Sequence, residues 1–238
     1  MNKTPEKWQQ VRLKVWGEGA CFTRPEMKVE RVSYDVMTPS AARGILEAVL
    51  WKPALRWVVE RIDVLKPIDL GRVDQNEASF QRMVAEAEDR PVRFASVRRN
   101  EVGCVFSKPN GFFIEDERQQ RAGLILRDVA YTLHARFELT DKAGPEDSVQ
   151  KFSQMFRRRA AKGQCFHRPY LGCREFEAHF QLVDFDQTLP RPVPETRDLG
   201  WMFHDFEYEG DRRARFFRAS LDQGRMIVPP LGSEGVVK

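Results

Sequence analysis

The sequence lacks the features that mark several protein classes. Its four cysteines, Cys21, Cys104, Cys165 and Cys173, have neither CxxC spacing nor the Cys/His spacing of a zinc site. No apolar run approaches the roughly 18 residues of a membrane span, and the polar start MNKTPEKWQQ has no apolar signal core. Because cysteines without an evident partner fit a reducing compartment, we expect a cytoplasmic protein with no membrane contact.

Motifs for cofactor or metal chemistry are absent as well. There is no Walker A loop and no GxGxxG, so nothing supports nucleotide-cofactor chemistry. No acidic cluster indicates a two-metal nuclease, and the aromatic RNP motif of ordinary RNA-recognition modules is missing. We therefore expect no metal and no cofactor, and any bound RNA does not need the usual aromatic platform on a sheet.

What remains is the composition of a globular protein with a substantial core. The 238 residues are 42% hydrophobic and 31% charged, and they include 17 Phe. The 39 Lys and Arg exceed the 35 Asp and Glu, so the formal net charge is +4. A chain of this length buries about 70–75% of its unfolded surface, so it needs neither disulfides nor metal to fold.

Four segments have the pattern of β-strands. Apolar and polar side chains alternate most clearly in residues 128–139, where Leu133 faces one way and His134 the other. Three further segments alternate or are rich in Val, Ile and Trp: residues 11–16, 56–65 and 175–184. Residues 17–37 have no clear period and are predicted to be a long loop, and the polar residues 66–90 are predicted to be irregular.

Two segments have the end signals of helices. Thr38 is a suitable N-cap before a proline at the first helical position, and Lys52-Pro53 stops this first helix. Acidic residues at 146 and 147 begin the second helix, and Gly163 suits the position just after its end. The apolar positions of both segments recur at helical spacing, which predicts that each helix buries one face.

The predicted order is strand, helix, strand, insert, strand, helix, strand. This is the split βαβ pattern of ferredoxin-like folds and of RNA-recognition modules. The insert at residues 91–121 contains a Pro-Asn-Gly turn and is predicted to be a β-hairpin, and residues 187–198 hold three prolines and are predicted to be a linker. We therefore predict an α+β protein with a ferredoxin-like (RRM-like, βαββαβ) domain over residues 1–186, and a linker and small antiparallel β domain over residues 187–238.

Positive charge is concentrated in residues 151–174, KFSQMFRRRAAKGQCFHRPYLGCR. These 24 residues hold seven Lys and Arg and no Asp or Glu, although the whole chain is only +4. A local excess of this kind suggests a polyanion partner. The alternative is helix electrostatics, because acids at a helix start and bases at its end suit the helix dipole, and this would account for residues 157–162.

Helix electrostatics does not account for cations outside the second helix. Some follow that helix, some lie near the first helix, and some precede the strand at residues 128–139. In a ferredoxin-like fold these segments can converge on one side of the sheet, where they would form a groove that tracks phosphates. The candidate RNA-binding residues are Arg24, Lys28, Arg31, Arg43, Arg121, Arg168 and Arg174.

Two titratable side chains are candidates for RNA cleavage without a metal. Such cleavage activates a 2′-hydroxyl for attack on the adjacent phosphate, and it needs a base, an acid and a cation for the developing charge. His167 lies in a loop, which favours function, but a histidine hydrogen-bonded within a turn is the alternative. Lys151 lies in the first turn of a helix, where the dipole disfavours a cation, and this suggests a specific role. Tyr34 is a stacking or proton-donor candidate, or a core residue.

Four segments carry a family resemblance. They are, in chain order, CFTRPEMKVERVSYDVMTPSAARGILEAVLWKP from Cys21, RRNEV from Arg98, RDVAYTLHARFEL from Arg127 and KGQCFHRPYLGCREF from Lys162. Together they resemble the subtype I-C CRISPR-associated proteins of Cas family five over nearly the whole chain. The resemblance implies a ferredoxin-like N-terminal domain plus a small C-terminal sheet.

The resemblance also implies a function. The subtype I-C member is the endoribonuclease that cuts the precursor CRISPR transcript in each repeat, by a metal-free route that leaves a 2′,3′-cyclic phosphate. It then stays on the 5′ handle of the guide RNA inside the interference complex. The implied partners are the repeat RNA, the guide RNA and the backbone and large subunits of that complex, with target DNA as a further candidate.

The family's site residues carry over incompletely. Some members have a tyrosine before the Trp-Lys-Pro that ends the first helix, where this chain has Leu50, and a Lys-His pair of the family aligns with Gln150-Lys151. An amine with a pKa of about 10 is a poor base, so we assign Lys151 to charge stabilisation and His167 to proton transfer. The alternative function is a non-catalytic subunit that binds and caps the 5′ handle.

Overall fold

The computed structural model of the protein describes residues 10–27, 31–73, 123–208 and 212–237. Contacts group Met1–Gly71 with Leu124–Lys238, and Arg72–Gly123 forms a separate unit. The predicted hairpin, with Arg121, lies outside the described residues, and so do Lys28 and Cys104.

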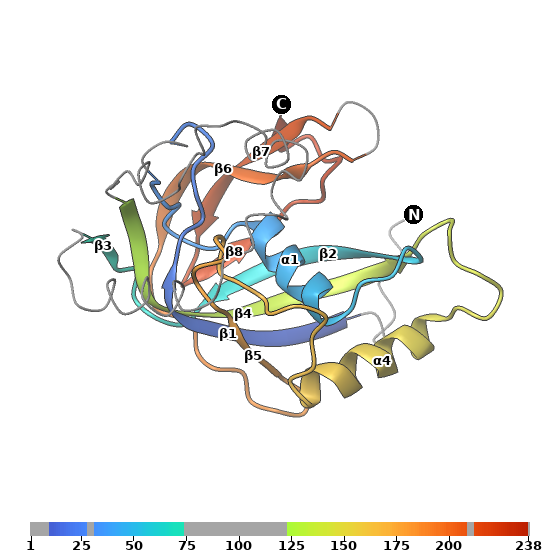
Figure 1. Ribbon diagram of the computed structural model, residues 1–238. Coiled ribbons are helices and arrows are strands. Elements are labelled where there is room, and N and C mark those ends of the chain that lie inside the picture. The colour runs from blue at the N-terminus through green and yellow to red at the C-terminus, as the bar shows by residue number, and fades with distance from the viewer. Residues whose placement is uncertain (1–9, 28–30, 74–122, 209–211, 238) are drawn as a thin grey trace, which may run out of the picture. The chain divides into compact units, whose positions relative to one another are not determined.

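A strand near the middle of the chain, β4, organises the larger of two sheets (Figure 1). β4 pairs antiparallel with β1 on one side and with β2 on the other, so that Leu133 lies opposite Leu13 and Ile62. The strand order is β5-β1-β4-β2-β8, and β3 pairs with β4 outside this path. The strands of this sheet are β1 (Gln10–Ala20), β2 (Leu55–Val64), β3 (Leu70–Val73), β4 (Gly123–Leu139), β5 (His179–Leu182) and β8 (Arg225–Ile227).

Both predicted helices are confirmed, but the second begins at Val149 and not at the acidic residues 146 and 147. The Thr38 hydroxyl caps α1 (Pro39–Val49) by accepting a hydrogen bond from the Ala41 backbone N–H. The Ser148 hydroxyl caps α4 (Val149–Ala161) in the same way. Gly163 follows α4 with a φ of +64°, the left-handed conformation that glycine adopts at low cost.

The core lies where the two helices meet the larger sheet. The Trp57 ring of β2 lies 5.0 Å from the Phe156 ring of α4 and 5.4 Å from the Phe137 ring of β4. Its indole N–H donates to the carbonyl of Leu50, at the end of α1, over 2.8 Å. The Leu50 side chain is itself fully buried, so this position belongs to the core. Tyr34 is also buried, and its hydroxyl accepts from the Phe203 N–H.

C-terminal residues contribute to both sheets. The strands β6 (Arg197–Phe206), β7 (Ala214–Leu221) and β9 (Val236–Val237) form a three-stranded antiparallel sheet in the order β6-β7-β9, as the sequence predicted in outline. β8 differs, because it pairs with β2 in the larger sheet, where Met226 is buried opposite Ile62. The domain boundary after residue 186 stays a prediction.

The predicted ends of three strands are wrong. β4 begins at Gly123 and not at residue 128, and one glycine explains much of the error in the other two. β1 continues past residue 16 to Ala20, into the predicted loop, and β5 begins only at His179. A Cβ on Gly17 would lie 2.5 Å from the Leu171 side chain and 2.7 Å from the Glu177 carbonyl. Glycine is therefore required there so that the segment before β5 can lie against β1, and it does not mark a strand end. Residues 70–73, predicted to be irregular, form β3.

Candidate functional site

The segment between α4 and β5, residues 163–178, is named the His167 loop here. Its Phe166 N–H donates to the Ala48 carbonyl in the last turn of α1, over 2.7 Å. Further along, the Leu171 carbonyl accepts from the N–H of Cys21, just after β1, over 3.0 Å. The loop thus runs along α1 toward the end of β1 (Figure 1).

A cavity of about 300 Å³ lies between the His167 loop and the start of α1. Its lining combines aromatic rings, hydroxyl groups and the first turn of the helix, and comprises Phe22, Thr23, Thr38, Ser40, Ala41, Gly44, His167, Pro169, Tyr170, Gly172 and Phe203. This volume is at the lower end of small-ligand pockets and suits one nucleotide. The positive end of the α1 dipole faces it, which favours an anionic group.

His167 is exposed at this cavity, and its contacts assign its two nitrogens. Nδ1 lies 3.1 Å from the Arg168 carbonyl, which can only accept, so Nδ1 carries the hydrogen. In the neutral ring, Nε2 then has the lone pair that can accept a proton. The ring stacks on Tyr170 at 6.4 Å and meets Phe166 edge-on at 6.2 Å. This arrangement can supply both a proton acceptor and a surface for a base.

Lys151 has a different setting, at the start of α4. Its Nζ lies 3.1 Å from the Asp147 carboxylate and 3.4 Å from the Glu146 carbonyl. The Gly144 N–H and Lys151 together hold the pKa of Asp147 below its usual value. The carboxylate four residues earlier therefore compensates a cation that looked misplaced on the sequence alone.

The structure does not bring Lys151 and His167 together. The Arg159 guanidinium, in the last turn of α4, donates to the Val49 carbonyl over 3.1 Å, so the end of α4 lies beside the end of α1. The His167 loop starts from that end, whereas Lys151 lies in the first turn. The 13 residues of α4 span about 20 Å. The two predicted catalytic residues thus lie toward opposite ends of the helix.

Most of the described RNA-binding candidates are paired with carboxylates. Arg24 lies 3.5 Å from Asp35, Arg31 lies 3.2 Å from Glu175, and Arg168 pairs with Glu177. Arg174 is exposed and makes no polar contact with any residue that the structure describes. Of these four arginines, Arg174 alone is thus free to meet a phosphate without first breaking an ion pair.

Arg43 is the most firmly held of the candidates. It bonds Asp205 of β6 over 2.6 Å and Glu47 over 2.7 Å. Burial alone would lower its pKa, but these two carboxylates raise the pKa of Arg43 above its ordinary value. The side chain therefore fastens α1 to β6, and its charge is largely neutralised within the protein.

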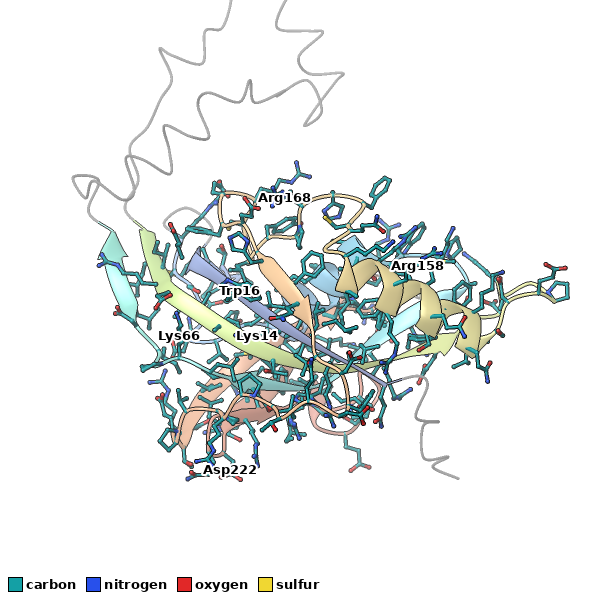
Figure 2. All side chains as sticks on the ribbon, turned by 90° about the horizontal axis from the view of Figure 1, so that it is seen from below. Lys14, Trp16, Lys66, Arg158, Arg168 and Asp222 are labelled. Carbon is teal, nitrogen blue, oxygen red and sulfur yellow. The ribbon has the colours of Figure 1, made fainter. Side chains whose placement is uncertain are left out.

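Two cations that helix electrostatics could explain have no ion-pair partner on the part of the surface that the structure describes. Arg158 and Lys162 are exposed and have no partner among the described residues, whereas Arg157 pairs with Asp184 over 3.0 Å. Figure 2 shows Arg158 on α4 and Arg168 on the His167 loop. Phe166 is 90% exposed. Unpaired cations and an exposed aromatic ring are the elements of a single-strand nucleic-acid surface, and no sequence pattern marked Phe166 as exposed.

Two negative findings concern the described part of the chain. Within those residues, no three or more His, Cys, Asp or Glu side chains are grouped so that they could hold a metal ion. No helix found there is long and apolar enough to cross a membrane.

A mixed α/β fold with antiparallel sheets, a nucleotide-sized cavity and unpaired cations on the described surface define a candidate nucleic-acid-binding protein. Comparison with known proteins gives the family. The model of the CRISPR-associated protein (Cas_Cas5) family matches residues 10–229, and the chain belongs to this family.

Two relatives are similar over nearly their whole length. The CRISPR pre-crRNA endoribonuclease Cas5d of Mannheimia succiniciproducens is 48% identical over 95% of this chain and 98% of its own. The protein of the same name from Thermus thermophilus is 45% identical over 92% of this chain and 91% of its own.

Solved structures show the same fold at lower identity. One, a CRISPR-associated protein, is 20% identical, covers 96% of both chains and superposes with a TM-score of 0.67. A functionally uncharacterized protein of Streptococcus mutans, also 20% identical, gives a TM-score of 0.66 and covers 96% of this chain and 97% of its own.

Proposed function

We propose that the chain is a cytoplasmic endoribonuclease that cuts precursor CRISPR RNA within the repeat. The observation that carries this proposal is the near-complete match to two relatives that are named CRISPR pre-crRNA endoribonuclease. We propose further that the product stays bound by its 5′ handle. The unpaired cations and the exposed Phe166 support this second step, because cations and exposed rings are the groups that hold a single strand.

The proposed chemistry is attack of a 2′-hydroxyl on the adjacent phosphate. The 2′-oxygen bonds to phosphorus, the bond to the 5′-oxygen breaks, and a 2′,3′-cyclic phosphate remains. His167 serves proton transfer at Nε2, since the Arg168 carbonyl holds the Nδ1 hydrogen. The scissile phosphate would lie near the first turn of α1, where the positive end of the helix dipole stabilises the charge that develops. This chemistry requires no metal ion.

Lys151 remains our proposal for charge stabilisation, with a condition that the geometry imposes. To reach a phosphate held near His167, Lys151 would have to break its ion pair with Asp147. Either the RNA or the protein would also have to rearrange over a distance equal to the length of α4. Without such a change Lys151 contacts a different phosphate of the same RNA.

The finer fold and the assembly also stay proposals. The strand order β5-β1-β4-β2 with α1 and α4 between strands supports a ferredoxin-like arrangement, because it follows the βαββαβ order. We propose that the chain works in a type I-C interference complex with its backbone and large subunits. Target DNA is a further proposed contact.

One experiment tests the enzymatic proposal. Purified protein is incubated in EDTA with a labelled repeat RNA, and in parallel with the same RNA carrying a single 2′-deoxy nucleotide at the cut site. Cleavage of the first RNA only, with a cyclic phosphate end, is the expected result. Tight binding with no cleavage of either RNA would reject the enzyme.

The second candidate function is a non-catalytic subunit that caps the 5′ handle. The separation of Lys151 from His167 favours it, because in this arrangement the two side chains do not act on the same phosphate. In that case both RNAs in the experiment above bind equally and neither is cut.

A further inference from the structure

Two cysteines that are 152 positions apart in the sequence meet just after β1. Cys21 follows the last residue of that strand and is 1% exposed, whereas Cys173 lies in the His167 loop and is half-buried. The Cys173 thiol donates to the Cys21 carbonyl over 3.4 Å. Two residues before Cys173, the Leu171 carbonyl accepts from the Cys21 N–H over 3.0 Å. The loop and the strand end are therefore held backbone to backbone at this point.

The two sulfur atoms share one neighbour. The Thr23 hydroxyl lies 3.6 Å from the Cys21 Sγ and 3.7 Å from the Cys173 Sγ. Each thiol also shifts the pKa of the other, because the two groups are close. Gly172 allows this approach, because a Cβ there would lie only 2.1 Å from the Cys21 carbonyl oxygen and its φ is +85°. The contact between the thiols is thus built into the backbone of the loop.

The two thiols are chemically unequal. The neighbouring Cys21 thiol lowers the pKa of Cys173 to about 6, and the Arg31 guanidinium acts in the same direction while Glu175 opposes it. The neighbouring Cys173 and burial raise the pKa of Cys21. A half-buried thiol with a lowered pKa beside a buried thiol is the arrangement of an attacking and a resolving cysteine.

We propose that Cys21 and Cys173 are a reversible redox site, at which a disulfide fixes the His167 loop to the end of β1. The oxidant is a small-molecule disulfide. The Cys173 thiolate attacks one of its sulfurs, the oxidant's S–S bond breaks, and one small thiolate leaves. The Cys21 sulfur then attacks Cys173 in the mixed disulfide, and the second small thiolate leaves. Two protein thiols are oxidised, and the small disulfide is reduced to two thiols that take up both protons.

The site touches the cavity. Three lining residues, Phe22, Thr23 and Gly172, are adjacent in sequence to the two cysteines or contact them. A disulfide would therefore restrain one wall of the cavity. It would also close a long loop of chain, so the oxidised protein should melt about 5 °C higher or more. The proposal does not depend on the proposed endoribonuclease function.

The test uses the full chain with Cys104→Ser and Cys165→Ser, which leaves only the proposed pair. This protein is equilibrated with mixtures of reduced and oxidised glutathione. We expect both free thiols to disappear together, a mass lower by about 2 Da, and reversal by dithiothreitol. Adding Cys173→Ser should abolish this change. Two thiols that persist in excess oxidised glutathione, or stable glutathione adducts in place of the intramolecular bond, would overturn the proposal.

A second measurement keeps the test decisive if the double variant does not fold. The wild-type chain is oxidised in the same mixtures, its free thiols are blocked, and it is digested without reduction. A peptide pair that joins Cys21 to Cys173 supports the site. A digest in which both cysteines carry the blocking group after oxidation contradicts it.

Discussion

The start of α4 and the His167 loop at its other end differ in how their charges are used. At the start, the Lys151 ammonium group contacts the carboxylate of Asp147, and the Lys151 backbone N–H donates to the Ser148 hydroxyl. At the end, Arg158 and Lys162 have no partner among the described residues, and His167 opens on a cavity. This difference shows that the number of Lys and Arg residues in a segment does not by itself locate an RNA-binding site. The position of the carboxylates decides which cations remain available to a polyanion.

Replacing His167 should produce the largest effect. We expect His167→Ala to lower the single-turnover cleavage rate of repeat RNA by about a hundredfold or more, because a proton acceptor is removed. The dissociation constant should change by no more than about threefold. His179→Ala is the matched control, since His179 is exposed on β5 and stacks on Trp16 away from the cavity lining. Equal losses in rate and affinity would mean that His167 only holds RNA.

Removing the free cations should weaken binding by a smaller factor. The triple variant Arg158→Ala, Lys162→Ala and Arg174→Ala should bind repeat RNA about 10- to 100-fold less tightly at low salt. The slope of log affinity against log salt should flatten by about 0.7 for each phosphate that the variant no longer neutralises. Filter binding or fluorescence anisotropy over a salt series measures both quantities.

Three paired cations form the control for that variant. Arg24→Ala, Arg31→Ala and Arg168→Ala remove the same charge, but each of these arginines already contacts a carboxylate. We expect a smaller loss of affinity and a smaller change of salt slope. A larger change in this control than in the free set would reverse the comparison.

Lys151→Ala should lower the cleavage rate by about tenfold or less, because Asp147 already neutralises this cation. Single-turnover kinetics beside His167→Ala compares the two ends of α4 directly. A hundredfold loss for Lys151→Ala, with unchanged affinity, would show that the start of α4 takes part in the chemistry and that the protein rearranges on RNA.

A buried histidine gives the smallest predicted effect and a control for pH experiments. Burial lowers the pKa of His204, whose Nε2 donates to the Pro229 carbonyl over 2.8 Å. The unfolded chain therefore binds this proton more readily than the folded chain, so stability falls as pH drops below the unfolded value. Denaturant unfolding should give a lower free energy of unfolding at pH 5.5 than at pH 7.5. His204→Gln should reduce that difference; an unchanged difference would assign it to other groups.

The sequence predicts well where local chemistry decides the structure. Thr38 before Pro39 marks the start of α1, and the alternation through Leu133 and His134 marks β4, because caps and strand faces depend on neighbours in the chain. The strand boundaries at Gly17 fail for the opposite reason, since the requirement for glycine comes from Leu171 and Glu177 far along the chain.

The candidate site was harder to predict for the same reason. His167 could be named from its loop, but the cavity depends on α1, on residues after β1 and on β6. In the sequence nothing pairs Arg43 with a carboxylate, but in the structure it bonds Asp205, which is 162 positions away. The contact between Cys21 and Cys173 likewise joins residues that are 152 positions apart. Such pairings follow from the tertiary fold and leave no spacing pattern in the sequence.

The most direct test of the central claim locates the cut site on the protein. A repeat RNA with a photoreactive nucleotide at the scissile position, blocked by a 2′-deoxy group, is crosslinked to the wild-type chain, and the linked peptide is identified by mass spectrometry. We predict attachment within residues 163–174 or at the first turn of α1, where the cavity lies. Attachment confined to the segment around Lys151 would contradict it.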